Sequence, residues 1–146
     1  MEVKQASSLI SKTWVLRFPD FKPSEVLSDD GLYAFARNII VVNFEALDAL
    51  QEFRTKLGKT ILVNHGQHRR RGYRSFIENA SVNGETYSYH MQGVAFDLTA
   101  PDMTVSELAQ AARDFGWKGI GIYKKRNFVH VDLRSRLLGD TVTWEG

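Results

Sequence analysis

The segment Gly119–Leu133, GIGIYKKRNFVHVDL, contains two apolar runs separated by the polar residues Lys124–Asn127. This pattern predicts a β-hairpin, with one strand in GIGIY and the other in FVHVDL. Because alternate side chains of a strand share a face, the second strand has its valines on one face and His130 and Asp132 on the other. We expect the valine face to pack on the core, which leaves an imidazole and a carboxylate together on the open face.

Other segments of the chain predict two helices and two further strands. VAFDL (Val94–Leu98) and TILVN (Thr60–Asn64) are short apolar runs typical of strands. From about Phe35 to Leu57, apolar residues recur every three or four positions, which predicts an amphipathic helix ending near Leu57. The residues TVSE (Thr104–Glu107) form a capping box, so a second helix is expected to begin there and to stop at Gly116.

The remaining segments are expected to be mainly loop. Residues 1–35 contain two of the prolines and predict a loop with a short helix near Ser24–Leu27. The polar segment His65–Tyr89 is long for a structureless loop, which favours a functional role. The chain is therefore expected to belong to the α+β class, with helices packed on a small, mainly antiparallel sheet. The open face of that sheet would carry the functional side chains. We expect one compact domain over residues 1–146, with residues 1–20 as a candidate loose N-terminal extension.

Composition restricts the class of protein. The 146 residues are 43% hydrophobic and 25% charged, which is typical of a globular domain rather than a disordered chain. Lys and Arg number 19 against 17 Asp and Glu, so no general affinity for polyanions is expected. Cysteine is absent, which excludes disulfides and thiolate metal sites. The N-terminus lacks the pattern of a secretory signal, and no stretch approaches the roughly 20 apolar residues of a membrane span.

The stretch SYHMQGVAFDL (Ser88–Leu98) contains a candidate pair of metal ligands, His90 and Asp97. Asp97 lies on the face of its strand opposite the apolar side chains, so it and His130 are both expected on the open face of the sheet. Two imidazoles and one carboxylate, with water in the fourth position, form a catalytic zinc site. By itself the spacing of His90 and Asp97 favours a surface pair, because a histidine and an aspartate seven residues apart more often form one.

Three segments in order resemble one peptidase family: RGYRS (Arg71–Ser75), SYHMQGVAFD (Ser88–Asp97) and GIGIYKKRNFVHVDLR (Gly119–Arg134). The second segment matches S-x-H-x-x-G-x-A-x-D. In this order the segments resemble the M15 family of zinc D-Ala-D-Ala carboxypeptidases and peptidoglycan endopeptidases, especially its small bacterial and bacteriophage members. The resemblance covers about residues 21–134.

The resemblance implies that one Zn²⁺ ion is bound by two imidazoles and a carboxylate, those of His90, Asp97 and His130. It also implies that Arg74 binds the substrate carboxylate or the carbonyl oxygen under attack. A guanidinium offers a rigid fork of donors suited to either group, although Arg74 also fits a surface arginine in a basic run. Tyr73 and Ser88 are further substrate-binding candidates. Tyr73 also fits a core position, and Ser88 also fits a hydrogen bond to the ligand loop.

The residue that would serve as general base is less well defined. Many family members carry a carboxylate three residues before the last histidine ligand, where this chain has Asn127, which cannot accept the proton. Asp132 lies two residues after His130 on the same strand face and is the candidate catalytic base. Its alternative role is to support a ligand or Arg134. A carboxylate from the Glu78–Glu85 loop is the remaining candidate.

The implied function is zinc-dependent hydrolysis of peptide bonds in peptidoglycan stem peptides or cross-links, by a carboxypeptidase or an endopeptidase. Zinc lowers the pKa of its bound water to about 7 and polarises the scissile carbonyl. We expect a monomer that is made in the cytoplasm and acts on peptidoglycan at the cell wall or in the periplasm. A phage lysis protein or a phage tail protein would fit the same description. No nucleic-acid partner is expected.

Two other function classes remain open. The basic and aromatic segment HRRRGYR (His68–Arg74) fits a nucleic-acid-binding module, although the rest of the chain offsets its charge. The presence of Asn127 leaves open a non-catalytic, metal-containing relative that binds the cell wall. His65 and His68 are weak candidates for a second metal site.

Overall fold

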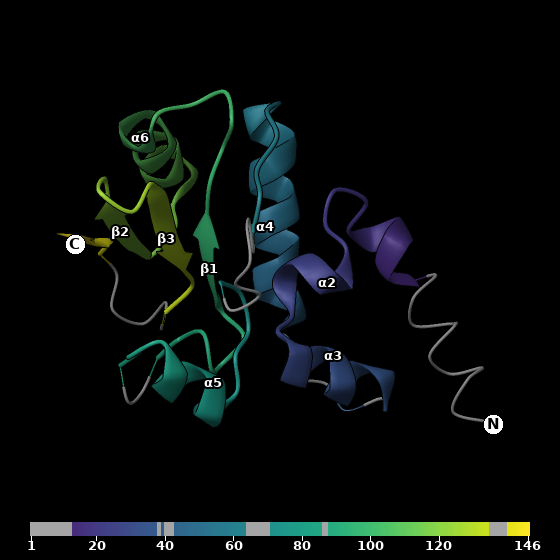
Figure 1. Cartoon of the computed structure of the whole chain (residues 1–146). Helices are drawn as coiled ribbons and strands as arrows, with labels where there is room; N and C mark the ends of the chain where they lie inside the picture. The colour runs from purple at the N-terminus through teal and green to yellow at the C-terminus, as the bar shows by residue number, and fades with distance from the viewer. Residues whose placement is uncertain (1–12, 38, 40–42, 64–70, 86–87, 135–139) are drawn as a thin grey trace.

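The computed structural model describes residues 13–37, 39, 43–63, 71–85, 88–134 and 140–146. After a helical turn at residues 13–17, its helices are α2 (Pro23–Val26), α3 (Asp29–Ala36), α4 (Phe44–Leu57), α5 (Phe76–Ser81) and α6 (Val105–Phe115). Its strands are β1 (Ala95–Leu98), β2 (Gly119–Tyr123), β3 (Phe128–Asp132) and β4 (Val142–Glu145). Figure 1 shows α4 beside the sheet, with α2 and α3 beyond it.

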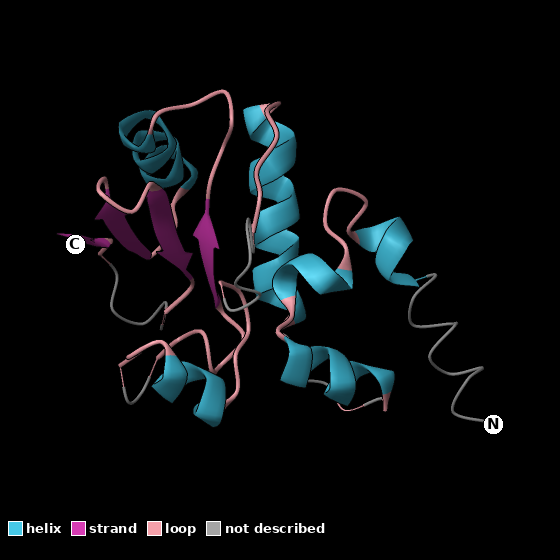
Figure 2. Ribbon diagram, viewed as in Figure 1, coloured by secondary structure: helices cyan, strands magenta, loops and turns pink. Residues whose placement is uncertain are grey.

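The strands form one sheet in the order β1-β3-β2-β4 (Figure 2). β3 pairs antiparallel with both β1 and β2, whereas β4 pairs parallel with β2. The α+β class, the hairpin and the strand at Val94–Leu98 are therefore confirmed. β4 was not predicted, because its four residues lie at the sheet edge and mostly face solvent, so they lack a buried apolar pattern.

One face of the sheet packs against α4 and α6, and the other face carries the polar residues. The buried side chains of the packed face are Phe96, Leu98, Ile120, Val129 and Val131. They meet the apolar sides of both helices, including Leu50 of α4 and Leu108 of α6. Because strand side chains alternate, this packing directs Asp97 and His130 to the opposite face.

The ends of the two long helices follow their capping residues. α4 ends at Gly58, whose φ of 65° is the left-handed conformation that glycine adopts without strain. The predicted start near Phe35 is wrong, because α3 ends at Ala36 and the Asn43 side chain caps a new helix at the Ala46 amide. The capping box before α6 is confirmed. Within the described part of the chain, no helix combines the length and the apolar character needed to cross a bilayer.

The expected strand TILVN is a single antiparallel bridge. Leu62 and Thr99 exchange backbone hydrogen bonds of 2.8 and 3.0 Å, while the Ile61 and Val63 side chains enter the core. Asn64 lies outside the described residues. The apolar run therefore reflects burial of its side chains rather than membership of the sheet.

The two segments expected to be loose or loop are partly ordered by packing and capping. Trp14 and Phe18 are buried and their rings meet edge to face, so these two side chains join the segment to the core. The polar segment 65–89 contains α5, which begins with a capping box between Ser75 and Glu78. Residues 1–12, 64–70 and 86–87 lie outside the described part.

Phe53 of α4 provides a test of the core. It is 2% exposed and its ring lies 5.1 Å from that of Phe115 and 6.0 Å from that of Trp117. Phe53→Ala should lower the free energy of unfolding by about 3–5 kcal/mol, measured by urea denaturation, because it leaves a cavity. Leu16→Ala is the control, since Leu16 is 85% exposed and such changes alter stability by about 0.5 kcal/mol or less. Equal losses in both variants would contradict this core.

Candidate metal centre

Antiparallel pairing of β1 with β3 places Asp97 directly opposite His130 on the polar face of the sheet. The same-face prediction for these two residues is confirmed. His90 reaches them from the turn that precedes β1. Gly93 closes that turn with a φ of 71° and an amide that donates to the His90 carbonyl at 3.2 Å. Glycine is favoured there because other side chains rarely adopt a positive φ.

Three ligand-type atoms converge at this point. His90 Nε2 lies 3.2 Å from Asp97 Oδ1 and 3.2 Å from His130 Nδ1, and His130 Nδ1 lies 3.1 Å from Asp97 Oδ1. A tetrahedral zinc site with bonds of about 2.0–2.1 Å separates its ligand atoms by about 3.3 Å. The spacing of the three atoms therefore fits a zinc ion.

The outer nitrogen of each imidazole is already engaged. His90 Nδ1 donates to the Gly72 carbonyl at 2.8 Å, and His130 Nε2 donates to Asp132 Oδ2 at 2.7 Å. Since a carbonyl and an ionised carboxylate only accept, the protons sit on these outer nitrogens and a lone pair of each ring is directed at the cluster. Two lone pairs and a carboxylate oxygen form a donor set that could hold a metal ion, as in metal sites whose histidines are oriented by outer hydrogen bonds.

The electrostatics of the site also favour positive charge at its centre. Burial opposes protonation of His130, but its bonds to Asp132 and Asp97 outweigh burial and raise its pKa to about 9. For His90, burial dominates and lowers the pKa. Burial likewise opposes ionisation of Asp97, yet the two histidines outweigh it and lower the Asp97 pKa. A metal ion would therefore compete with a proton held between Asp97 and His130.

Asp132 lies on the far side of His130 from the cluster. Its side chain is fully buried and accepts from His130 Nε2 and from three donors of Arg134: the amide at 3.0 Å, Nε at 2.9 Å and Nη2 at 2.8 Å. Burial opposes ionisation of Asp132, but the His130 and Arg134 bonds outweigh it and lower the pKa. This placement favours the alternative role for Asp132, the support of His130, over that of general base.

A pocket opens beside the cluster, and Arg74 and Ser88 line it together with His90, Asp97 and His130. Arg74 Nη2 donates to Ser88 Oγ at 3.3 Å, and the same oxygen accepts from the His90 amide at 3.2 Å. Ser88 thus supports the ligand loop and also lies at the pocket. Burial lowers the pKa of Arg74, while the Asp97 carboxylate opposes that effect.

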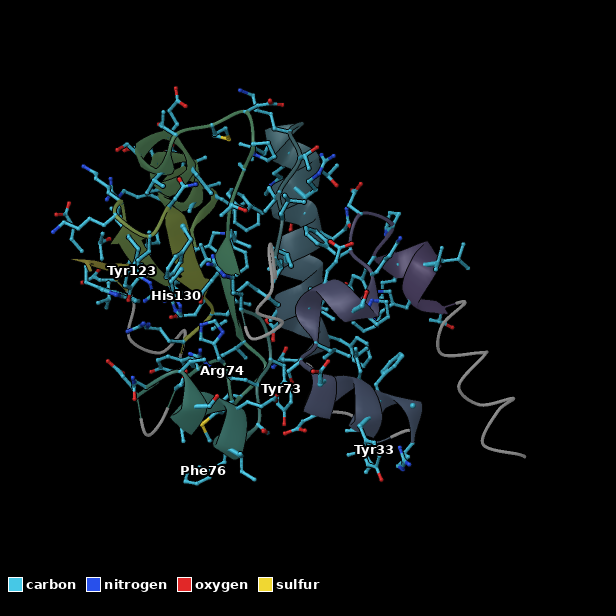
Figure 3. All side chains as sticks on the ribbon, in the orientation of Figure 1. Tyr33, Tyr73, Arg74, Phe76, Tyr123 and His130 are labelled. Carbon is cyan, nitrogen blue, oxygen red and sulfur yellow. The ribbon has the colours of Figure 1, made fainter. Side chains whose placement is uncertain are left out.

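Tyr73 takes the core position instead. It forms a bridge with Leu27, packs against the hydrophobic core, and its ring lies close to Gly31. In Figure 3, Tyr123, His130 and Arg74 lie on the side of the sheet and α5, whereas Tyr73 points toward α3. The expected substrate-binding role for Tyr73 therefore lacks a structural basis among the described residues.

Several residues that line the pocket were not identified as candidates from the sequence. Asn127 occupies the hairpin turn with a φ of 56°, which asparagine tolerates better than most residues. The pocket is lined by its neighbour Arg126 and by Tyr123 and Trp144, and also by Glu85 of the loop considered above for the general base. Only the pairing of β4 with β2 brings Trp144 to this face, and no local pattern reveals such a contact. His65 and His68 lie outside the described residues.

The Peptidase M15 family model matches residues 20–132. The chain belongs to this family. The peptidoglycan L,D-endopeptidase MepK of Escherichia coli K12 is 33% identical over 66 residues, which are 42% of this chain and 36% of that protein. The "Probable peptidoglycan L,D-endopeptidase MepK" of Haemophilus influenzae is 31% identical over 80 residues, 51% of this chain and 40% of that protein. The matched parts thus span about two fifths of the length of these curated relatives.

The assignment of the metal ligands stays a prediction, and elemental analysis tests it. His90→Ala should remove one of the three ligands, so the purified variant should carry far less than one equivalent of zinc. His68→Ala changes a histidine that we exclude from the site and should keep the wild-type zinc content. Full zinc content in the His90→Ala protein would contradict the assignment.

Proposed function

We propose that this M15 family chain is a zinc-dependent peptidase that hydrolyses peptide bonds in peptidoglycan stem peptides or cross-links. The convergence of His90 Nε2, Asp97 Oδ1 and His130 Nδ1, with both outer imidazole nitrogens engaged, carries the proposal. The names of the relatives favour an endopeptidase over a D-Ala-D-Ala carboxypeptidase. The described residues would then act as one catalytic domain at the cell wall.

The chemistry is divided between the metal and the pocket. A bound zinc ion would polarise the scissile carbonyl and make a water molecule nucleophilic at neutral pH. Arg74 would hold the substrate, because its partly buried guanidinium faces the pocket and offers a fork of donors to a carboxylate or a developing oxyanion. Ser88 would keep that guanidinium and the His90 loop together.

Among the carboxylates considered as general base, Glu85 has the best position. The Asp132 oxygens are already engaged by His130 and Arg134. Glu78 is 6% exposed and accepts from the Ser75 amide at 2.9 Å. Glu85 is exposed and lines the same pocket as the three candidate ligands, which supports a role for its carboxylate beside an attacking water. We therefore assign Glu85 to the transfer of a proton from that water to the leaving amine.

Two isosteric variants separate support of a ligand from proton transfer. Glu85→Gln should keep its zinc and lose about 10²–10⁴-fold in kcat, the usual contribution of a general base. Asp132→Asn should instead weaken zinc binding by about 10–100-fold, because it removes the negative charge and one of the two acceptor oxygens that bind His130 and Arg134, and excess zinc should restore its activity. Steady-state kinetics and zinc titration of both proteins give the comparison. The opposite pattern would reverse the two roles.

Digestion of soluble muropeptides tests the activity itself. Wild-type protein should release smaller peptides, and mass spectrometry of the products should show whether a terminal D-alanine or an internal bond is cut. A chelator should abolish the reaction and added zinc should restore it. Binding of muropeptides without any cleavage would favour the non-catalytic cell-wall-binding alternative. Tight DNA binding that survives physiological salt would favour the nucleic-acid module.

A further inference from the structure

The polar face of the sheet carries a row of four paired positions. Asp97 on β1 is opposite His130 on β3, His130 is opposite Gly121 on β2, and Gly121 is opposite Trp144 on β4. Paired residues of neighbouring strands share a face. Trp144 therefore lies on the same face as the candidate metal ligands, two strands away from His130.

Gly121 provides the space in which Trp144 reaches toward the site. A Cβ at position 121 would lie 2.7 Å from Cε2 and 2.8 Å from Cζ2 and Nε1 of the Trp144 indole. The indole consequently lies over the backbone of β2. Its ring centre is 5.2 Å from that of His130, with an angle of 51° between the planes. A larger residue at position 121 would push the indole away from this place.

Two polar groups fix the indole there. Trp144 Nε1 donates to the Tyr123 hydroxyl at 3.0 Å. The Arg134 guanidinium lies 4.9 Å from the indole centre, within the range of a cation–π contact. The indole is only partly buried, and the pocket beside the metal cluster is lined by Trp144, Tyr123 and Arg134 together.

We propose that Trp144 forms a substrate-contacting wall of the pocket and that Gly121 is required to seat it. This inference rests on the proposed peptidase function. The occupant that fits an indole beside the Arg134 cation is the aliphatic part of a peptide residue next to the scissile bond. Trp144 also lies beyond residues 20–132, the part that the family model matches, so the family match does not assign it this role.

The two possible roles of Trp144, contact with the substrate and support of His130, predict different kinetics for its variants. Removing a wall that contacts the bound substrate in its ground and transition states raises KM and leaves kcat and the zinc content unchanged. A Trp144 that only shields His130 and Arg134 would instead affect the zinc content or kcat. The kinetics of muropeptide hydrolysis by the zinc-loaded protein therefore separate the two roles.

The variants form a double-mutant cycle between positions 121 and 144. Trp144→Ala should raise KM for soluble muropeptides about tenfold, which corresponds to one well-packed aromatic contact. Gly121→Ala should have a similar effect, because its methyl group displaces the indole. The double variant should be no worse than Trp144→Ala, since the clash disappears with the indole. Trp144→Phe should keep KM close to the wild-type value, because an aromatic ring still lines the pocket. Glu145→Ala changes an exposed residue of the same strand and should have the KM of the wild type.

A second measurement reports on binding without turnover. The indole N–H signal of Trp144 in an NMR spectrum, assigned by its loss in Trp144→Phe, should shift when muropeptides are added. The signals of Trp14 and Trp117, which are buried in the core, should stay in place. Gly121→Ala should move the Trp144 signal even without muropeptides. If Trp144→Ala fails to fold, the Trp144 indole signal and the KM of Gly121→Ala still test whether Trp144 contacts the substrate.

Failure of this inference differs from failure of the proposed function. A wild-type protein that cleaves no muropeptide would overturn the function and the inference together. Cleavage by wild type combined with an unchanged KM in Trp144→Ala, a static Trp144 signal, or additive effects of the two substitutions would overturn the wall alone. Loss of zinc in Trp144→Ala would likewise assign Trp144 to support of His130.

Discussion

The register of β1 against β3 is the constraint on which the site depends. It places Asp97 opposite His130, and the same alternation buries Val129 and Val131 under the helices. A slip by one residue would exchange the two faces of β1, sending Asp97 into the core and Phe96 into the pocket. The hydrophobic core therefore helps to enforce the geometry of the candidate metal site, because a shift by one residue would leave the apolar face unburied.

Burial gives this polar face its chemical character. His90 is 2% exposed and His130 is 9% exposed, so their interactions with Asp97 are poorly screened by water. In such surroundings, lone pairs that face one another cost free energy unless a cation lies between them. The Gly72 carbonyl and the Asp132 carboxylate fix the outer protons and so keep the lone pairs directed inward.

Sequence reasoning succeeded where the signal is local and failed where it depends on distant pairing. The alternation in FVHVDL placed His130 on the open face, and Gly58 and Gly116 marked the ends of α4 and α6. An apolar run such as TILVN reports only that its side chains are buried, which a single bridge satisfies as well as a strand. Trp144 belongs to the site through a parallel pairing with β2 that no short segment encodes.

The residues beyond the family match close the far side of the His130 ring. Arg134 binds Asp132 with three donors, and its guanidinium lies 4.8 Å from the Tyr89 ring centre and 4.9 Å from that of Trp144. The carboxylate that orients His130 is therefore neutralised by Arg134, whose guanidinium also lies beside aromatic rings from the ligand loop and from β4. Because those rings also line the pocket, a substrate that contacts them would act on the same group of side chains that holds His130 in place.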